Sequence, residues 1–197
     1  MRRPPLASAL PPAAFAVAAL AAGPAAAHTF GTEGGGFALG LLHPLVGADH
    51  LLAMFAVGLW AWQLGGRAVW AVPGSFVAVM AAGAGIALAG WPMPAVETGI
   101  AASVLLLGLL VAAAVRLPPA AAAGLVGLFA LFHGAAHGLE LPRSAGPLAY
   151  GAGFLAATAL LHAAGIGLAA LMALRRSLWL RASGLAVGMA GLGFLYA

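Results

Sequence analysis

The sequence predicts an all-α polytopic membrane protein that folds as a compact bundle of six transmembrane helices. Hydrophobic residues make up 64% of the 197 residues, charged residues only 6%, and the mean hydropathy is +1.08. This composition excludes an ordinary soluble core. The apolar residues also divide into six segments, each near the roughly 20 residues that a helix needs to cross a bilayer. The expected spans are residues 37–64, 69–90, 95–115, 120–141, 148–174 and 178–196.

Short connections separate the six spans, and each carries residues that interrupt helices. The first span ends at Gly65 and Gly66, the second before the proline-containing segment 91–94, the third at the prolines 118–119, and the fourth before segment 142–147. A pair of arginines ends the fifth span. Because glycine and proline punctuate helices, these positions define the expected turns.

The first 27 residues have the pattern of a cleavable signal peptide. Arg2 and Arg3 precede an apolar run of about ten residues, too short to span a membrane, and the alanines 25–27 form a small-residue cleavage site. The mature protein is then a single six-helix domain, residues 28–197. Its new N-terminal residue, His28, could bind a cation through its α-amine and ring nitrogen, and a plain flexible leader is the alternative.

The arginines predict the orientation of the bundle in the membrane. If the mature N-terminus lies outside, five arginines fall in or beside inside connections and one falls outside, as the positive-inside rule requires. The five are Arg67, Arg116, Arg175, Arg176 and Arg181, and the one is Arg143. We therefore expect a multi-pass protein of the bacterial inner membrane with both termini in the periplasm. The net charge of +4 includes no lysine and reports this orientation rather than nucleic-acid binding.

The order of the spans is compatible with two inverted three-helix halves. The first and fourth spans both carry histidines, and their three-helix offset makes them run in opposite directions, as in many transporters. Glycines recur at close helical spacing, as in Gly134-x3-Gly138 and Gly184-x3-Gly188. Such small residues let helix backbones approach each other where lipid provides no hydrophobic drive. Oligomeric state is open, and a homo-oligomer is compatible with the sequence.

Ionisable residues lie inside the first and fourth spans, where they are energetically unfavourable. A charged side chain at the middle of a spanning helix costs roughly 2.5–3.5 kcal/mol on insertion scales, so several in one bundle imply pairing or a bound cation. In the first span His43 and His50 are seven residues apart and are expected to share a face. Asp49 could bind a cation directly or orient an imidazole. Pro44 removes a backbone donor and is a candidate kink.

The fourth span carries a stripe of three potential ligands. His133, His137 and Glu140 have the spacing i, i+4, i+7, which places them within roughly 60° of arc on one helix face. One face therefore offers two imidazoles and a carboxylate. His162 in the fifth span and Glu97 in the third have no partner within their own segments.

Depth along the expected helices sorts these residues into two layers. One layer, near the helix midpoints, contains Asp49, His50, His133 and His162. The other, nearer the outside ends, contains His43, Glu97, His137 and Glu140. This arrangement predicts an outer vestibule that feeds a site at the membrane midplane. Below that site the sequence is nearly all apolar, so release inward requires a conformational change or a pore lined by backbone and small residues.

The ligand types indicate a divalent transition metal. The chain has no cysteine, so thiolate sites and disulfides are excluded, and imidazole and carboxylate remain as the strong donors. Such donors suit Ni²⁺, and affinity alone does not separate it from Co²⁺, Cu²⁺ or Zn²⁺. We expect the metal to be a transported substrate held by an incomplete protein shell, with no permanently bound cofactor.

Two motifs resemble the HupE/UreJ family of bacterial nickel and cobalt permeases. They are H-P-x2-G-x-D-H-x-L-A-M at residues 43–54, followed by G-L-W-A at 58–61, and F-H-G-x-A-H-G-x-E at residues 132–140. The resemblance implies a permease that moves Ni²⁺ or Co²⁺ into the cytoplasm to supply hydrogenase or urease, and not an enzyme. It implies that the motif residues are ligands, namely His43, Asp49, His50, His137 and Glu140.

Other classes of protein remain as alternatives. A membrane-embedded hydrolase could bind zinc with three histidines and an aspartate and use Glu140 as a general base, although the His-Glu-x2-His motif is absent. A metal sensor could use the same ligands, and a b-type haem protein could use two facing histidines. The tryptophans, which lie close to segment ends, are interpreted as interface anchors, and the scattered methionines as packing residues.

Overall fold

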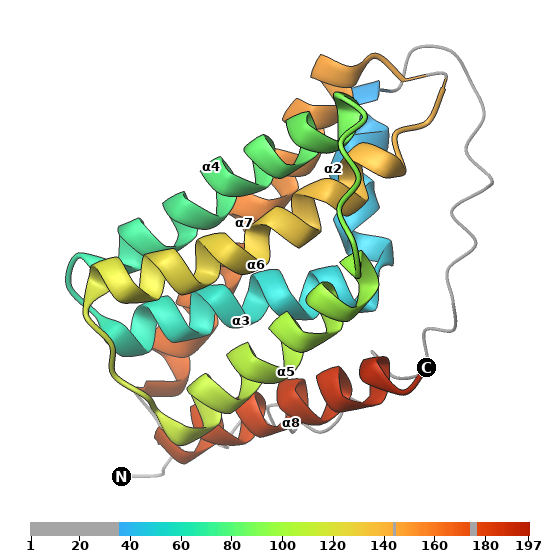
Figure 1. Ribbon diagram of the computed structural model, residues 1–197. Helices are drawn as coiled ribbons and strands as arrows, with labels where there is room; N and C mark the ends of the chain where they lie inside the picture. The colour runs from blue at the N-terminus through green and yellow to red at the C-terminus, as the bar shows by residue number, and fades with distance from the viewer. Residues whose placement is uncertain (1–35, 144, 174–176) are drawn as a thin grey trace, which may run out of the picture.

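The described residues of the computed structural model, 36–143, 145–173 and 177–197, fold into seven α-helices (Figure 1). The predicted signal peptide and His28 lie outside these residues. The helices are α2 (Gly36–Val46), α3 (Ala48–Leu64), α4 (Ala68–Leu88), α5 (Val96–Ala113), α6 (Pro119–Leu139), α7 (Pro147–Ala173) and α8 (Ser177–Leu195). Five of them are long and apolar enough to cross a membrane, and the bent pair of α2 and α3 makes a sixth if the two helices count as one span. The structure therefore confirms the predicted all-α polytopic bundle.

The first span is broken, and the expectation of one continuous helix over residues 37–64 is wrong. The axes of α2 and α3 differ by 83°. The break lies at Gly47, whose extended backbone (φ −86°, ψ 109°) separates the two helices, whereas Pro44 stays inside α2. Because the helix is interrupted between them, His43 and His50 do not lie on one continuous face.

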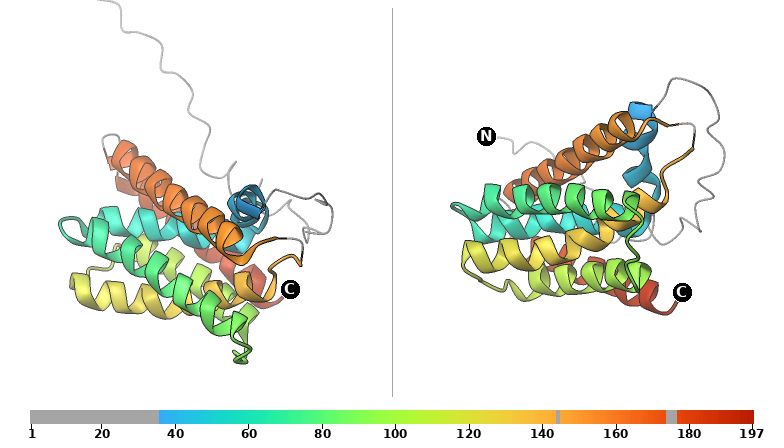
Figure 2. Two further views of the ribbon diagram at one scale, coloured as in Figure 1. Left: turned by 90° about the horizontal axis from the view of Figure 1, so that it is seen from above. Right: turned by 45° about the horizontal axis from the view of Figure 1, so that its top comes forward.

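The helices pack in three main pairs, which Figures 1 and 2 show from several sides. α4 packs along α6, α5 packs along α8, and α7 packs against both parts of the broken span, with α2 lying across one end of the bundle. If the first half is exchanged with the second, α2/α3 corresponds to α6, α4 to α7 and α5 to α8. The α4–α6 pair then corresponds to the α7–α2/α3 pair, and the α5–α8 pair corresponds to itself. This is the pattern expected for two inverted halves.

Glycines permit the close approach of these pairs, as their spacing predicts. A Cβ atom at Gly134 in α6 would overlap the Met80 carbonyl oxygen in α4. A Cβ at Gly58 in α3 would likewise overlap the His162 carbonyl oxygen in α7, and Gly108 in α5 lies directly against the α8 backbone. Backbone-to-backbone packing of this kind holds the helices in a defined register.

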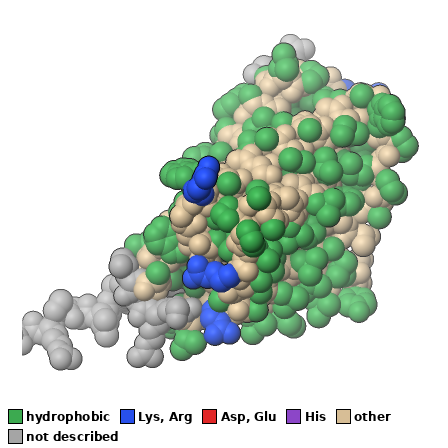
Figure 3. Space-filling model, turned by 60° about the vertical axis from the view of Figure 1, so that its left-hand side comes forward, with side chains coloured by type: hydrophobic (Ala, Val, Ile, Leu, Met, Phe, Trp, Pro, Cys, Tyr) green, Lys and Arg blue, Asp and Glu red, His purple; other side chains and the backbone are tan. Residues whose placement is uncertain are grey.

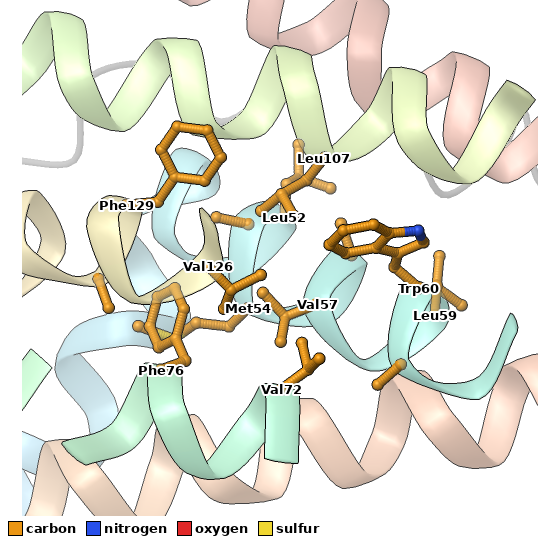
Figure 4. Close-up of a cluster of buried hydrophobic side chains, with 14 of the residues drawn as sticks. Leu52, Met54, Val57, Leu59, Trp60, Val72, Phe76, Leu107, Val126 and Phe129 are labelled. Carbon is orange, nitrogen blue, oxygen red and sulfur yellow. The ribbon is translucent and has the colours of Figure 1, made fainter. Parts of the chain in front are cut away.

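Helix α3 forms the centre of the bundle, and its side chains supply much of the apolar core. Figure 4 shows Met54, Val57 and Trp60 of α3 pointing into this core, with Phe76 of α4 opposite. Trp60 is fully buried and its indole N–H donates to the Val115 carbonyl at 3.0 Å, so its interpretation as an interface anchor is wrong. Trp70 and Trp91, by contrast, are 79% and 72% exposed near helix ends.

The two ends of the bundle carry opposite charge. At one end, which we call the arginine end, Arg67 lies in the α3–α4 connection, Arg116 donates to the Leu64 carbonyl, and Arg181 donates to the Ala112 carbonyl. Figure 3 shows basic side chains on this face amid a largely apolar surface, and no acidic or histidine side chain. The opposite end, the acidic end, carries Glu97 and Glu140 in addition to Arg143.

Candidate metal centre

Three ligand-type side chains meet at the acidic end and form what we call the outer trio. His43 comes from α2, His137 from the last turn of α6, and Glu140 follows directly after α6. One donor atom from each lies within 4.8 Å of the others. His43 Nε2 is 2.8 Å from Glu140 Oε2, and His137 is fully buried with both ring nitrogens unpartnered among the described residues. The trio thus combines a solvent-reachable carboxylate with a buried imidazole.

The fold of α2 brings His43 to Glu140. Gly40, one turn before His43, allows α2 to lie directly on the α7 backbone at Tyr150 and Phe154. The hydrogen bond from His43 lowers the pKa of the Glu140 carboxyl below its ordinary value. Because the Glu140 side chain is half exposed, this charged carboxylate faces the acidic end of the bundle, where it can attract a cation.

Asp49 and His50 form a pair in the first turn of α3, one step further into the bundle. His50 Nδ1 is 3.0 Å from Asp49 Oδ1, and the same oxygen accepts the His50 backbone N–H at 2.7 Å. Donation from Nδ1 to the carboxylate leaves the lone pair on Nε2, which is buried and has no partner among the described residues. A carboxylate that orients a histidine in this way is the usual support of a metal ligand.

Ser103 of α5 fixes the ring of His133 in a comparable way. The Ser103 hydroxyl donates to the Ile100 carbonyl at 2.6 Å, and its oxygen is 2.8 Å from His133 Nε2. Since the single hydroxyl proton goes to the carbonyl, His133 donates from Nε2, and its lone pair lies on the unpartnered Nδ1. His133 therefore also presents a free nitrogen ligand.

The four imidazoles form a continuous column from the acidic end into the bundle. The ring centroids of His43 and His137 are 5.0 Å apart, those of His137 and His50 4.7 Å, and those of His50 and His133 4.8 Å. We call these four residues the histidine column. Successive rings meet edge to face, so the four side chains are in direct contact.

His162 and Glu97 lie outside this column. The ring of Phe76 contacts both His133 and His162, with centroid distances of 5.4 and 5.1 Å, and the place of His162 in the expected midplane layer stays a prediction. Glu97 is exposed in the first turn of α5, six residues before Ser103, which corresponds to about 9 Å along the helix. No hydrogen bond or ion pair in the described part of the chain joins Glu97 to the histidines.

Comparison with known proteins identifies the chain. The family model described as HupE / UreJ protein matches residues 16–194. The chain is also 50% identical over 174 residues to Protein HupE of Rhizobium leguminosarum bv. viciae, covering 87% of this chain and 91% of that protein. The chain belongs to the HupE/UreJ family. No solved structure matches it.

Membership of the HupE/UreJ family confirms the predicted resemblance and associates the protein with nickel and cobalt supply to hydrogenase and urease. The motif residues of this HupE/UreJ chain all lie in one place. His43, His50 and His137 belong to the histidine column, while Glu140 and Asp49 are the carboxylates that contact it. Their role as metal ligands stays a prediction.

The sequence did not reveal several residues that shape this site. Ser103, Phe76, Tyr150 and Phe154 all contact column histidines, and Phe154 stacks on His137 at 4.6 Å. Ser103 could have been noticed as a hydroxyl in the middle of an apolar span. The aromatic residues carry no comparable signal, because they are ordinary constituents of a membrane helix.

Proposed function

We propose that this HupE/UreJ protein is a permease that carries Ni²⁺, with Co²⁺ as the second candidate cargo, across the bacterial inner membrane into the cytoplasm. There the ion would supply hydrogenase or urease. The observation that carries the proposal is the histidine column, a line of four imidazoles, three of them with an unpartnered buried nitrogen, that begins at a charged carboxylate and ends inside the bundle. Imidazole and carboxylate together suit late first-row divalent metals.

The spacing of the donors supports transport rather than tight storage. Two nitrogens on opposite sides of one ion, each about 2.1 Å away, are at most about 4.2 Å apart. The donor atoms of the outer trio are spread over up to 4.8 Å, and His43 is already engaged with Glu140. Binding therefore requires a small contraction, and water completes the shell. A carrier needs such exchangeable binding because it must also release its ion.

The direction of transport in this proposal follows from charge. Arginine-rich connections stay on the cytoplasmic side of membrane proteins, so the arginine end faces the cytoplasm and the acidic end faces the periplasm. Nickel then enters at Glu140 and passes along the column toward His133. Both chain termini lie on the periplasmic side in this arrangement.

The test is uptake of radioactive nickel into proteoliposomes that contain the purified protein. We expect saturable uptake in the wild type and its loss in His50→Ala, with Leu160→Ala, an exposed position on α7, as the matched control that retains uptake. Excess cobalt, copper or zinc is added as a competitor, and the degree to which each ion inhibits nickel uptake ranks the protein's preference among the metals. Nickel binding without uptake in the wild type would contradict the permease and leave a metal sensor or a metal-dependent hydrolase.

A further inference from the structure

Two methionine thioethers and a threonine hydroxyl meet at the inner end of the histidine column. Thr158 Oγ1 of α7 lies 3.3 Å from the Met54 sulfur of α3 and 3.9 Å from the Met80 sulfur of α4. All three side chains are fully buried. Met54 lies one helical turn beyond His50 on α3, and Met80 lies one turn from Phe76, which contacts His133.

The thioether lone pairs in this cluster are available for a metal. The Thr158 hydroxyl has one proton and three nearby acceptors, and the Phe154 carbonyl at 2.8 Å is the best of them. The sulfurs of Met54 and Met80 are weak acceptors that gain little from the hydroxyl. Three helices thus bring the two polarizable sulfurs close to the Thr158 hydroxyl oxygen. Packing of an apolar core alone would not require this grouping.

His162 adds a nitrogen donor one turn further along α7. It is four residues after Thr158 and therefore on the same helix face. Its side chain is only 2% exposed, and neither ring nitrogen has a partner among the described residues. It touches Phe76, which lies one turn from Met80 on α4. Buried polar groups are normally hydrogen-bonded, so an imidazole with two free nitrogens here points to a ligand that binds it.

We propose that Met54, Met80 and His162 form a second, softer metal-binding site between the histidine column and the arginine end. The inference rests on the proposed function in that the cargo is a late first-row divalent cation. Thioether and imidazole ligands favour Ni²⁺ or Co²⁺ over Mg²⁺, Ca²⁺ and Mn²⁺, so this inner site adds sulfur donors to the nitrogen and oxygen donors of the outer trio.

X-ray absorption at the nickel edge tests the site directly, using the purified full chain loaded with two equivalents of Ni²⁺. We expect a sulfur scatterer in the wild type, its loss in the double variant Met54→Leu/Met80→Leu, and its retention in Met189→Leu, a 60% exposed position on α8. The chain has no cysteine, so any sulfur ligand is a methionine. Absence of sulfur in the wild type, or its persistence in the double variant, would overturn the site.

Binding and uptake of the same variants separate the two proposals. Leucine conserves the volume of methionine, so the fold and the histidine column should be retained. We expect unchanged affinity for the first nickel equivalent and at least about a tenfold loss for the second, with slower uptake. If wild-type uptake is saturable but no sulfur is seen, the inner site fails and the permease stands. If sulfur is seen without uptake, the site stands and the permease fails.

Discussion

At the scale of single residues, the important feature is which nitrogen of each imidazole is free. Asp49 accepts the hydrogen bond from His50 Nδ1, and Ser103 accepts the one from His133 Nε2. The opposite nitrogens are left unpartnered and buried. Two supporting residues, one of them a single serine in an apolar helix, thereby turn buried histidines into available ligands.

The role of Asp49 can be tested with Asp49→Asn. The amide is nearly the same shape but has no charge, and its NH₂ group can donate to His50 Nδ1, which would move the ring proton to Nε2 and block the ligand. We expect nickel affinity to fall about 10–100-fold, measured by equilibrium dialysis in detergent. Ser75→Ala, which removes a hydroxyl bonded to the Ala123 carbonyl away from the column, should bind as the wild type does. Equal affinity in both variants would contradict the orienting role.

Ser103→Ala is expected to act mainly on stability. It removes the acceptor for the buried His133 Nε2 proton, and side-chain hydrogen bonds inside membrane proteins contribute about 0.6 kcal/mol on average and up to about 1.7 kcal/mol. The thermal unfolding midpoint in detergent should fall. Saturating nickel should raise the midpoint again in part, because we expect nickel to bind His133 Nδ1 in the folded protein. An unchanged midpoint with and without nickel would show that the serine does not support the ring.

Residue types alone predicted much of this site. The i, i+4, i+7 spacing of His133, His137 and Glu140 describes one face of a helix that remains unbroken in the structure. His162 lies outside the column, and its depth along α7 could not predict Phe76, whose ring contacts both His162 and His133. Which side chains lie between two helices depends on their rotation, and the sequence does not state that rotation.

At the scale of the elements, the break at Gly47 is the main departure from expectation. Pro44 suggested a kink, but a proline inside a helix removes only one hydrogen bond, and α2 continues to Val46. The break at Gly47 instead starts a new helix. Asp49 then lies in the first turn of α3, where a carboxylate is stabilised by the helix dipole. The break also turns α2 across α7, which brings His43 to Glu140.

The close approach of α4 and α6 leads to a prediction with an internal control. Gly134→Ala adds a methyl group that overlaps the Met80 carbonyl oxygen and must push the helices apart, at a cost of about 1–3 kcal/mol. Gly124→Ala, on the same helix but with no atom within 4 Å of the added carbon, should be neutral or stabilising by up to about 1 kcal/mol. The free energies of unfolding in detergent measure both, and similar values would show that the helices are not in backbone contact.

At the scale of the whole molecule, function depends on an asymmetry between the two ends. The three main helix pairs map onto one another under exchange of the halves, but only the first half contains a broken helix among the described residues, and the carboxylates that contact the column lie toward one end. The imidazoles that a cation at Glu140 could bind therefore lie on one side only, toward the interior of the bundle. In the proposed orientation, the arginines at the opposite end make that direction inward.

This orientation can be measured because the chain has no cysteine, so any introduced thiol is unique. Gly146→Cys places one in the exposed connection between α6 and α7 at the acidic end, and Pro118→Cys places one in the exposed connection between α5 and α6 at the arginine end. A membrane-impermeant maleimide should label the Gly146→Cys variant in intact spheroplasts and the Pro118→Cys variant only after permeabilisation, since arginine-rich connections stay in the cytoplasm. The reverse pattern would place the carboxylates in the cytoplasm, and the same column would then begin on the side where the ion should be released.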